Sequence, residues 1–440
     1  MSFSSGEIVN LASNQNRVAV VYGLRTPFVK AGTVFKNLSS LDLGKLITVE
    51  LINRTEIDPK VIDKVIFGTV LPSIKTSNLA REISLGAGVP ASVPAFTVTS
   101  ACASSVQAFT NGIDSIMSGD SHVVLIGGVE SISDFPVLFS KNFRNVLADS
   151  SKGKNFLQKA KPFLRMGVGD IAPDIPAVAE RYTGLTMGKS ADKMARQNQI
   201  SKKDQDEFAL RSHTLASKAQ KEEIVRREIA KTFIPPEFAE PYSADNTIRK
   251  DLNLDILSSL PPAFDKEYGT VSSGNSAPLS DGACALLLMS EENAKALGYK
   301  PLGYVRSYAY SAVDPKDQLL MGPSYSTPIA LDRAGITLKD LDLIEIHEAF
   351  SAQVLSNLRA LGSKKFAEEK LSRSKPVGEV DMDSVNVTGG SIAIGHPFGA
   401  TGGRLILTLL YGLQRRQTQF GLATVCAAGG LGASVVLERK

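Results

Sequence analysis

The chain has 440 residues, more than one ordinary domain, so we expect two or three packed units with substantial hydrophobic cores. Its formal net charge is only +4, from 49 Lys and Arg residues against 45 Asp and Glu residues. This mild basicity suits an anionic substrate. It argues against a nucleic-acid-binding protein, which would carry a concentrated basic stripe.

The N-terminus and the cysteine content predict a soluble, cytoplasmic protein. The first residues contain no basic region followed by an apolar one, so neither secretion nor a signal anchor is expected. Nowhere do about 18 apolar residues follow one another, as a membrane span requires. Three cysteines cannot form a disulfide framework in so long a chain, which indicates a reducing compartment.

Cys102 lies between two predicted elements. Residues 95–98 form a strand-like apolar stretch, which turns through small residues into a helical stretch that starts near Ser104. Unpaired N–H groups and the macrodipole at such a helix terminus favour the thiolate. A fall in the thiol pKa from ~8.5 to ~6.5 would raise the thiolate fraction at pH 7 from roughly 3% to roughly 75%. The pattern thus predicts a nucleophilic Cys102; the alternative is an inert, buried cysteine.

Residues 141–165 are basic and irregular. Seven Lys or Arg residues stand against one acidic residue, Asp149, with apolar residues between them. Such a charge run is usually a solvated face, but basic amphipathic segments also contact partner subunits or anionic membrane surfaces. From residue 192 to residue 224 the sequence becomes helical, and His213 is expected to be an exposed or packed residue of that helix.

Two histidines stand in separate motifs of the C-terminal part. Residues 344–350 form an apolar strand that ends at His347. A metal site is not predicted, because no second histidine lies four residues on and the other possible ligands follow no zinc spacing. Residues 389–403 are rich in glycine around His396. They contain neither the lysine of a P-loop nor the spacing of a dinucleotide site, so a positioned general base fits better.

The other two cysteines have different surroundings. Cys426 ends a short apolar strand and is followed by small residues at 427–432, whose N–H groups could face a ligand. By itself this pattern could also be an ordinary strand and turn. Cys284 lies in an apolar run at 283–289 and is expected to belong to the core.

Two segments about 300 residues apart share one plan. Residues 102–128 and residues 400–426 each start with small residues, continue as an amphipathic helix and end in an apolar strand. We interpret this as a duplicated α/β unit in which crossover helices connect parallel strands.

Together, the four motifs that contain these cysteines and histidines resemble the thiolase family. Within it, they resemble the degradative branch that supplies the β-subunit of the fatty-acid oxidation trifunctional complex. Residues 17–28, similar to the family's opening strand and turn, and residues 269–282 extend the resemblance over essentially the whole chain. His347 favours the degradative branch, because many thiolases carry Asn at this position.

The resemblance implies an α/β fold with two similar βαβαβαββ halves, five layers (αβαβα) and a loop domain inserted in the first half. We expect the N-terminal half at residues 1–135 and 262–295, the loop domain at 136–261 and the C-terminal half at 296–440. The loop domain is expected to bind CoA and to provide a possible partner contact.

The resemblance also implies a reaction. Cys102 would attack a 3-oxoacyl-CoA after His396 accepts its proton. His396 and His347 would donate to the enolate oxygen of the departing acetyl-CoA, and Cys426 would serve as acid and base. Backbone N–H groups of Cys102 and Ala428 would hold the other oxyanion. CoA would be a co-substrate, and no metal or permanently bound cofactor is implied.

Contacts with CoA are implied for four residues: Met187, Arg249, Ser276 and Met321. Two positions depart from relatives, since Ala277 stands where some carry Ser and Thr186 where some carry His. The branch further implies at least a homodimer, or a heterotetramer with a hydratase/3-hydroxyacyl-CoA dehydrogenase α-subunit. It favours a partner contact for residues 141–165 over a peripheral membrane contact.

Three other functions stay open at this point. A short-chain acetoacetyl-CoA thiolase would share every catalytic group and differ only in the depth of its acyl pocket. A ketoacyl synthase shares the duplicated fold but uses one cysteine and two histidines. A structural or lipid-carrying subunit would need no activated thiol.

Overall fold

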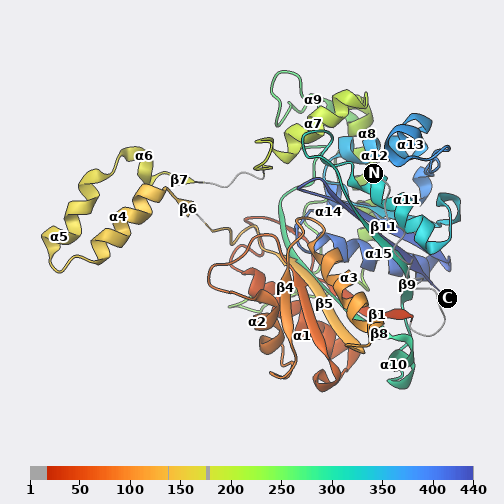
Figure 1. Cartoon of the computed structure of the whole chain (residues 1–440), viewed down its shortest axis with the longest axis horizontal. Helices are drawn as coiled ribbons and strands as arrows, with labels where there is room; N and C mark the ends of the chain where they lie inside the picture. The colour runs from red at the N-terminus through yellow and green to blue at the C-terminus, as the bar shows by residue number, and fades with distance from the viewer. Residues whose placement is uncertain (1–16, 137, 175–178, 440) are drawn as a thin grey trace. The chain divides into compact units, whose positions relative to one another are not determined.

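The computed structural model describes residues 17–136, 138–174 and 179–439, and it divides into two compact units. The large unit contains the residues up to Asp134 and those from Glu180 onward, and the small unit is Phe135–Ala179. Figure 1 follows the elements of both units along the chain.

The N-terminal half of the large unit contains a sheet with the strand order β4-β3-β5-β8-β1. Strand β3 is parallel to β4 and β5, whereas β8 is antiparallel to β5 and β1. Most of these strands are buried on both faces, which explains their continuous apolar sequences. The bounds are β1 (Val18–Arg25), β2 (Val29–Lys30, beside β8), β3 (Lys64–Gly68), β4 (Ala95–Val98), β5 (Val123–Glu130) and β8 (Ser280–Ser290).

The C-terminal half repeats this arrangement with the order β10-β11-β12-β9. Strands β10 and β11 are parallel, and β12 is antiparallel to both β11 and β9. At the position that corresponds to β4, Val385 forms an isolated parallel bridge with Ile344. The duplicated α/β unit predicted from the sequence is therefore confirmed. The bounds are β9 (Gly303–Ala312), β10 (Leu343–Ile346), β11 (Phe420–Ala427) and β12 (Leu431–Glu438).

Helices form three layers that alternate with the two halves of the sheet. One apolar core joins α1 and α2 to the outer face of the N-terminal half. A second joins α3 and α15 to the inner faces of both halves, and a third joins α11 and α12 to the outer face of the C-terminal half. This is the predicted αβαβα order. The bounds are α1 (Ser40–Thr55), α2 (Leu79–Gly86), α3 (Ser104–Met117), α11 (Gly322–Ala334), α12 (Ser351–Gly362) and α15 (Thr401–Arg416).

Helix α3 is held close to the end of β3. Val106, Phe109 and Ile113 recur every three or four residues and are all buried, so one face of the helix packs on the sheet. Gly68 permits the close approach, because a Cβ atom there would lie 2.4 Å from the backbone carbon of Ser104. This packing places the segment that precedes α3 at the edge where the parallel strands end.

Part of the predicted loop domain belongs to the large unit. Helix α8 buries Phe208 and Ala209 in the same core as α11 and α12. The separate unit is therefore 135–179, shorter than the predicted insertion at 136–261. That residues 180–261 act together with the small unit stays a prediction. The remaining helices of the large unit are α7 (Met187–Gln197), α8 (Lys202–Lys221), α9 (Leu254–Ser259), α10 (Glu291–Ala296), α13 (Lys364–Leu371) and α14 (Ser391–Ile394).

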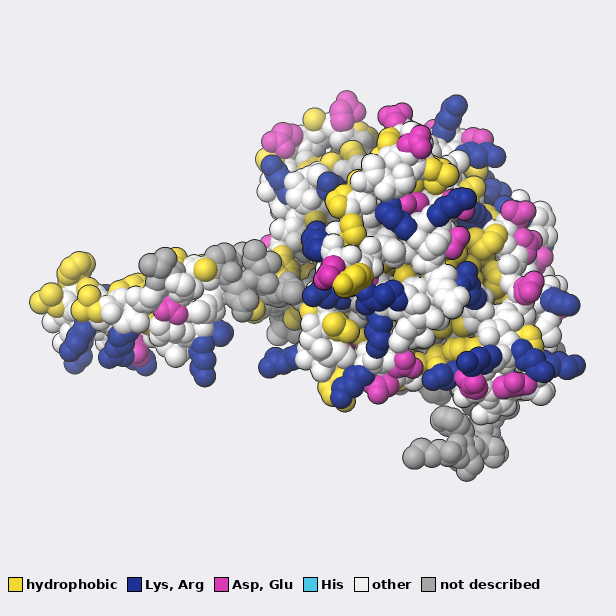
Figure 2. Space-filling view, turned by 90° about the horizontal axis from the view of Figure 1, so that it is seen from above, with side chains coloured by type: hydrophobic (Ala, Val, Ile, Leu, Met, Phe, Trp, Pro, Cys, Tyr) yellow, Lys and Arg dark blue, Asp and Glu magenta, His cyan; other side chains and the backbone are white. Residues whose placement is uncertain are grey.

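The small unit is a set of short helices with little core. Its elements are β6 (Leu138–Phe139), α4 (Lys141–Ser151), α5 (Phe156–Ala160), α6 (Val168–Ile171) and β7 (Pro173–Asp174), the two strands being paired. Phe156, Leu157 and Leu164 are 83%, 79% and 88% exposed. Figure 2 shows hydrophobic side chains along one edge of this unit and Lys and Arg side chains along another. Within the described parts of the chain, no helix is both long and apolar enough to cross a bilayer.

Candidate active site

Cys102 lies in the turn between β4 and α3, as the sequence predicted. Ala101 adopts a left-handed conformation with φ of 47°, which is costly for a residue with a Cβ atom. Ser104 stabilises the turn, since its hydroxyl donates to Ala101 O (2.6 Å) and accepts from Ser100 N (2.9 Å). The thiol is thereby presented to His396, whose Nε2 lies 3.2 Å from Cys102 Sγ.

The predicted acidic thiol at Cys102 is wrong. Burial raises the pKa of Cys102 to about 12, and the charge of Glu130 adds to this increase. The backbone N–H groups of Ala428 and of Cys102 itself donate to the sulfur and lower the pKa, but by less than burial raises it. The helix-terminus effect is therefore outweighed, because removing a thiolate from water costs more than these donors return. A reaction at this thiol would therefore need a neighbouring base to accept its proton.

His396 is well placed to be that base. It follows the short helix α14, after Gly395 with φ of 99°, and its Nδ1 lies 2.7 Å from Thr401 Oγ1. Burial lowers the pKa of His396 to about 3, and the positive charge of Arg404 contributes. The imidazole is therefore neutral at pH 7. A protonated thiol beside a neutral imidazole is the resting pair of a nucleophile and its base.

His347 stands beside His396, directly after β10. The ring centroids are 4.2 Å apart, and one nitrogen of each ring and Cys102 Sγ lie within 4.8 Å of one another. His347 is fully buried, its Nδ1 lies 3.0 Å from Ser391 Oγ and its Nε2 has no hydrogen-bond partner among the described residues. Burial lowers the pKa of His347 well below its usual range, with contributions from His396 and Arg404. His347 is thus also neutral.

Cys426 is the penultimate residue of β11, which lies beside β10, the strand that leads to His347. Strands β10 and β11 are parallel neighbours, and His347 N donates to Thr424 O (2.9 Å), so both strand ends meet at one edge of the sheet. Cys426 is 1% exposed. Burial, reinforced by the nearby Cys102 charge, raises the pKa of Cys426 well above its usual value. Cys426 is therefore a thiol, able to donate a proton.

The predicted CoA contacts divide into two groups. Met187 and Met321 pack in the same apolar cluster as Cys426. Arg249 is exposed, and its backbone N–H donates to Nδ1 of the buried His213 (3.1 Å). Ser276 donates its hydroxyl to Ser272 O (2.7 Å). The structure thus places the two methionines in the cluster of Cys426, and Ser276 lies beside it through a backbone bridge to Phe350 of the same cluster, whereas the contact of Arg249 is with His213.

Sequence reasoning missed several buried polar groups behind the histidines. Ser391 and Thr401 contact the two imidazoles, and Arg404 Nη2 donates to Ser391 Oγ (3.0 Å). Arg404 is fully buried and also donates to Glu345 (3.2 Å). The sequence did contain a sign of these groups. Arg404 follows the glycine-rich motif on an otherwise apolar helix face, and an arginine buried there needs hydrogen-bonding or charged partners.

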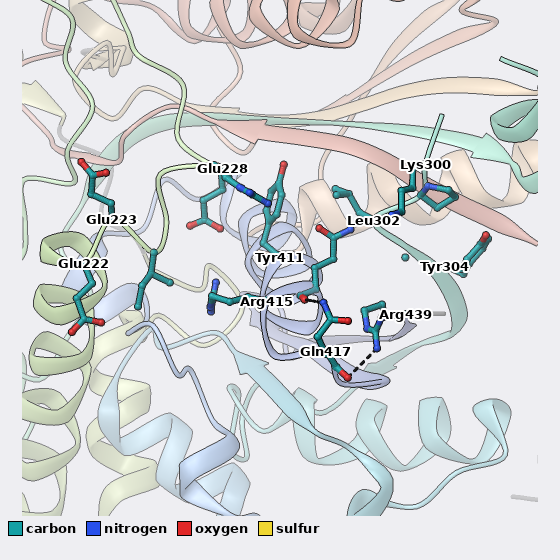
Figure 3. Close-up of a pocket in the computed structure, with 15 residues that line it drawn as sticks. Glu222, Glu223, Glu228, Lys300, Leu302, Tyr304, Tyr411, Arg415, Gln417 and Arg439 are labelled. Carbon is teal, nitrogen blue, oxygen red and sulfur yellow. Dashed lines mark hydrogen bonds between the residues drawn. The ribbon is translucent and has the colours of Figure 1, made fainter. Parts of the chain in front are cut away.

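Another cavity of the large unit, of about 930 Å³, lies away from these residues (Figure 3). Charged side chains from the segment that follows α8 and from α15 line it, including Glu222, Glu228 and Arg415. None of the four predicted catalytic side chains is among the described residues around it. Glu228 accepts hydrogen bonds from the buried Arg25 (3.2 Å) and from Thr408 (3.0 Å), so it belongs to a structural ion cluster.

The pKa values of Cys102 and His396 predict how the rate of Cys102 alkylation depends on pH. Because the pKa of Cys102 is raised to about 12, alkylation by iodoacetamide without substrate should rise about tenfold per pH unit from pH 7 to pH 9. Because the pKa of His396 is lowered to about 3, its basic form should persist throughout that range. The rate is measured by mass spectrometry of the Cys102 peptide, with Cys102→Ser as the control. A plateau below pH 8 would instead indicate the acidic thiol.

Comparison with known proteins agrees with this site. Models of the N-terminal and C-terminal thiolase domains match residues 18–292 and 299–439. The 3-ketoacyl-CoA thiolase of Shewanella sp. strain W3-18-1 is 50% identical, covering 96% of this chain and 97% of that protein. The 3-ketoacyl-CoA thiolase of Shewanella frigidimarina is also 50% identical, covering 97% and 98%.

Solved structures of two related enzymes share the fold. The Bacillus anthracis acetyl-CoA acetyltransferase superposes with a TM-score of 0.83 at 31% identity, covering 96% of this chain and 98% of that chain. Human mitochondrial 3-ketoacyl-CoA thiolase in complex with CoA gives 0.82 at 29% identity, covering 97% and 98%. This chain therefore belongs to the thiolase family, a family of acyltransferases, as its sequence motifs predicted.

Proposed function

We propose that the chain cleaves a 3-oxoacyl-CoA with CoA, giving acetyl-CoA and an acyl-CoA two carbons shorter, through an acyl-Cys102 intermediate. The observation that carries this proposal is the 3.2 Å contact between Cys102 Sγ and His396 Nε2, with a second thiol, that of the buried Cys426, nearby. Cleavage of a carbon–carbon bond next to a thioester needs a nucleophile, its base and a separate acid. This site contains all three.

In the first step, Cys102 attacks the C3 carbonyl and its thiol proton passes to His396 Nε2. The C3 oxygen becomes negatively charged in the tetrahedral adduct. The N–H groups of Cys102 and Ala428, which donate to the Cys102 sulfur, are suited to stabilise that oxygen. Proton transfer and attack are coupled, because burial disfavours a free thiolate beforehand.

In the second step, the C2–C3 bond breaks and leaves a thioester on Cys102 and the enolate of acetyl-CoA. Hydrogen bonds from protonated His396 and from His347 stabilise the enolate oxygen. Cys426 donates its proton to C2 and becomes a thiolate. Acetyl-CoA then leaves.

In the third step, CoA enters and its thiol proton passes to the Cys426 thiolate. The CoA sulfur attacks the acyl-Cys102 thioester. When the C–S bond to Cys102 breaks, the released Cys102 sulfur recovers its proton from His396. Each group thereby returns to its starting protonation state.

We place the preferred substrate in the long-chain class and the reaction at the last step of fatty-acid β-oxidation. The relatives named 3-ketoacyl-CoA thiolase at 50% identity over nearly their whole length support this, as does His347. The alternative is a short-chain acetoacetyl-CoA thiolase. The fold does not separate the two, because the B. anthracis acetyltransferase and the human thiolase superpose equally well.

Turnover of 3-oxohexadecanoyl-CoA and of acetoacetyl-CoA, each with CoA, tests this assignment. We expect a higher kcat/KM for the long substrate, measured by loss of the 3-oxoacyl-CoA absorbance. Turnover confined to acetoacetyl-CoA would move the chain to the short-chain class. No turnover of either would refute the proposed reaction.

For CoA, Met187 and Met321 would form apolar walls beside the thioester and pantetheine, since both pack with Cys426. Arg249 would meet a phosphate through its exposed guanidinium, which suits phosphate oxygens. Ser276 would contact pantetheine.

We further propose that the small unit contacts a partner subunit of the hydratase/dehydrogenase kind in a cytoplasmic heterotetramer built on a homodimer. The exposed apolar residues beside its lysines and arginines support a protein contact. Co-purification with the chain, lost on deletion of residues 138–174, tests this. Binding of the intact chain to anionic vesicles, without any partner, would favour a membrane contact instead.

A further inference from the structure

The two active-site histidines each contact a hydroxyl group through Nδ1. Ser391 Oγ lies 3.0 Å from His347 Nδ1, and Thr401 Oγ1 lies 2.7 Å from His396 Nδ1. A neutral imidazole carries a single N–H group, so the direction of the hydrogen bond at Nδ1 decides whether Nε2 is a donor or an acceptor. The two hydroxyl groups therefore determine whether Nε2 of each histidine donates a hydrogen bond to a substrate or accepts one from it.

The hydroxyl of Thr401 directs its proton away from His396. Thr401 Oγ1 donates to Pro397 O (2.9 Å), and a hydroxyl has only one proton. Thr401 must then accept a hydrogen bond from His396 Nδ1–H. His396 Nε2 is left without a proton, 3.2 Å from Cys102 Sγ, as a base requires.

The hydroxyl of Ser391 has the opposite arrangement. Arg404 Nη2 donates to Ser391 Oγ (3.0 Å), and a guanidinium cannot accept. Among the described residues, the other contact of Ser391 Oγ is His347 Nδ1, so the Ser391 hydroxyl donates its proton to that nitrogen. His347 Nδ1 then accepts, and its proton resides on Nε2. Arg404 is itself fixed, because it is fully buried and donates to Glu345 Oε2 (3.2 Å).

Resting on the proposed function, we propose that Ser391, oriented by Arg404, is a positioning residue that keeps the His347 proton on Nε2. His347 is then a ready donor to the enolate oxygen of acetyl-CoA, while His396 is the base for Cys102. His347 Nε2 has no hydrogen-bond partner among the described residues, so an N–H there has a substrate oxygen as the acceptor that would satisfy it.

The proton positions can be measured directly. The chain has four histidines, so ¹⁵N-labelled histidine gives few ring signals, which His122→Gln, His213→Gln and His347→Gln variants assign. Long-range ¹H–¹⁵N correlations of the wild type at pH 7 should place the His347 proton on Nε2 and the His396 proton on Nδ1. A His347 proton on Nδ1 would overturn the proposal, whatever the activity of the protein.

Kinetics test the consequence of this proton position. Ser391→Ala should lower kcat for thiolysis by about 10- to 100-fold, with KM for the 3-oxoacyl-CoA changed by less than about twofold, and the His347 proton should be shared between both nitrogens. Ser391→Thr keeps the hydroxyl and should restore kcat. Ser356→Ala is the matched control, because it removes another buried hydroxyl, bonded to Ala352 O (2.7 Å).

Two outcomes contradict the proposal. The first is an unchanged kcat in Ser391→Ala, and the second is an equal loss of kcat in Ser391→Ala and Ser391→Thr. If Ser391→Ala does not fold, the wild-type spectrum and the threonine variant still decide. Failure of the proposed function is recognised separately, as an absence of thiolysis by the wild type.

Discussion

Cys102→Ser is expected to lower kcat for thiolysis by roughly 10⁴-fold or more, equivalent to about 5 kcal/mol of transition-state stabilisation. An alcohol is a far weaker acid than a thiol, and the neighbouring His396, whose pKa burial lowers to about 3, is a weak base. No acyl-enzyme should form. Steady-state rates with a long-chain 3-oxoacyl-CoA, together with mass spectrometry of the protein after a single turnover, measure both effects.

Cys284→Ser is the matched control for this experiment. Cys284 is fully buried in β8, and its sulfur donates to Ala400 O (3.3 Å), so it has no role in the proposed reaction. Its substitution should leave kcat within about threefold of the wild type in the folded protein. An acyl group found on Cys284, or activity retained by Cys102→Ser, would require a different nucleophile.

Cys426→Ala should separate the two half-reactions. The variant has no acid for C2 of the enolate, so cleavage of 3-oxoacyl-CoA should fall by about 10²- to 10⁴-fold. Exchange of labelled CoA into an acyl-CoA needs only Cys102 and a base, and His396 still lies 3.2 Å from Cys102 Sγ. This exchange should survive within about tenfold, and the variant should no longer catalyse solvent deuterium exchange at C2 of acetyl-CoA.

Measuring both cleavage and CoA exchange in Cys426→Ala distinguishes the loss of an acid from the loss of the folded site. A misfolded site would lose CoA exchange and cleavage together. Equal loss in a protein with an unchanged thermal transition would mean that His396 cannot replace Cys426 as the base for CoA in the acyl-transfer step. Full retention of cleavage would remove Cys426 from the mechanism.

Local sequence was sufficient to predict much of the fold and the identity of the reactive residues. Cys102 and Cys426 each stand between an apolar stretch and small residues, and the structure places Cys102 in the turn after β4 and Cys426 near the end of β11. The repeated plan at 102–128 and 400–426 appears in the structure as α3 followed by β5 and α15 followed by β11. These features depend on short-range periodicity and on glycine, which the sequence displays directly.

The local pattern failed where burial decides the outcome. A position before a helix predicted an acidic thiol at Cys102, yet burial raises its pKa to about 12. Desolvation depends on every element that packs around the sulfur, and these come from both halves of the chain. The end of the small unit also depends on tertiary packing. Helix α8 packs on the C-terminal half and so belongs to the large unit.

The residue types, their strand and helix settings and the duplication could be predicted from the sequence, because these features follow from neighbours in the chain. Which groups meet depends on how the whole chain packs. It brings His396 Nε2 within 3.2 Å of Cys102 Sγ across 294 positions, and it places Arg404 and Ser391 behind His347. Contacts of this kind arise from the packing of the two halves of the sheet on their shared helices, so no local pattern specifies them.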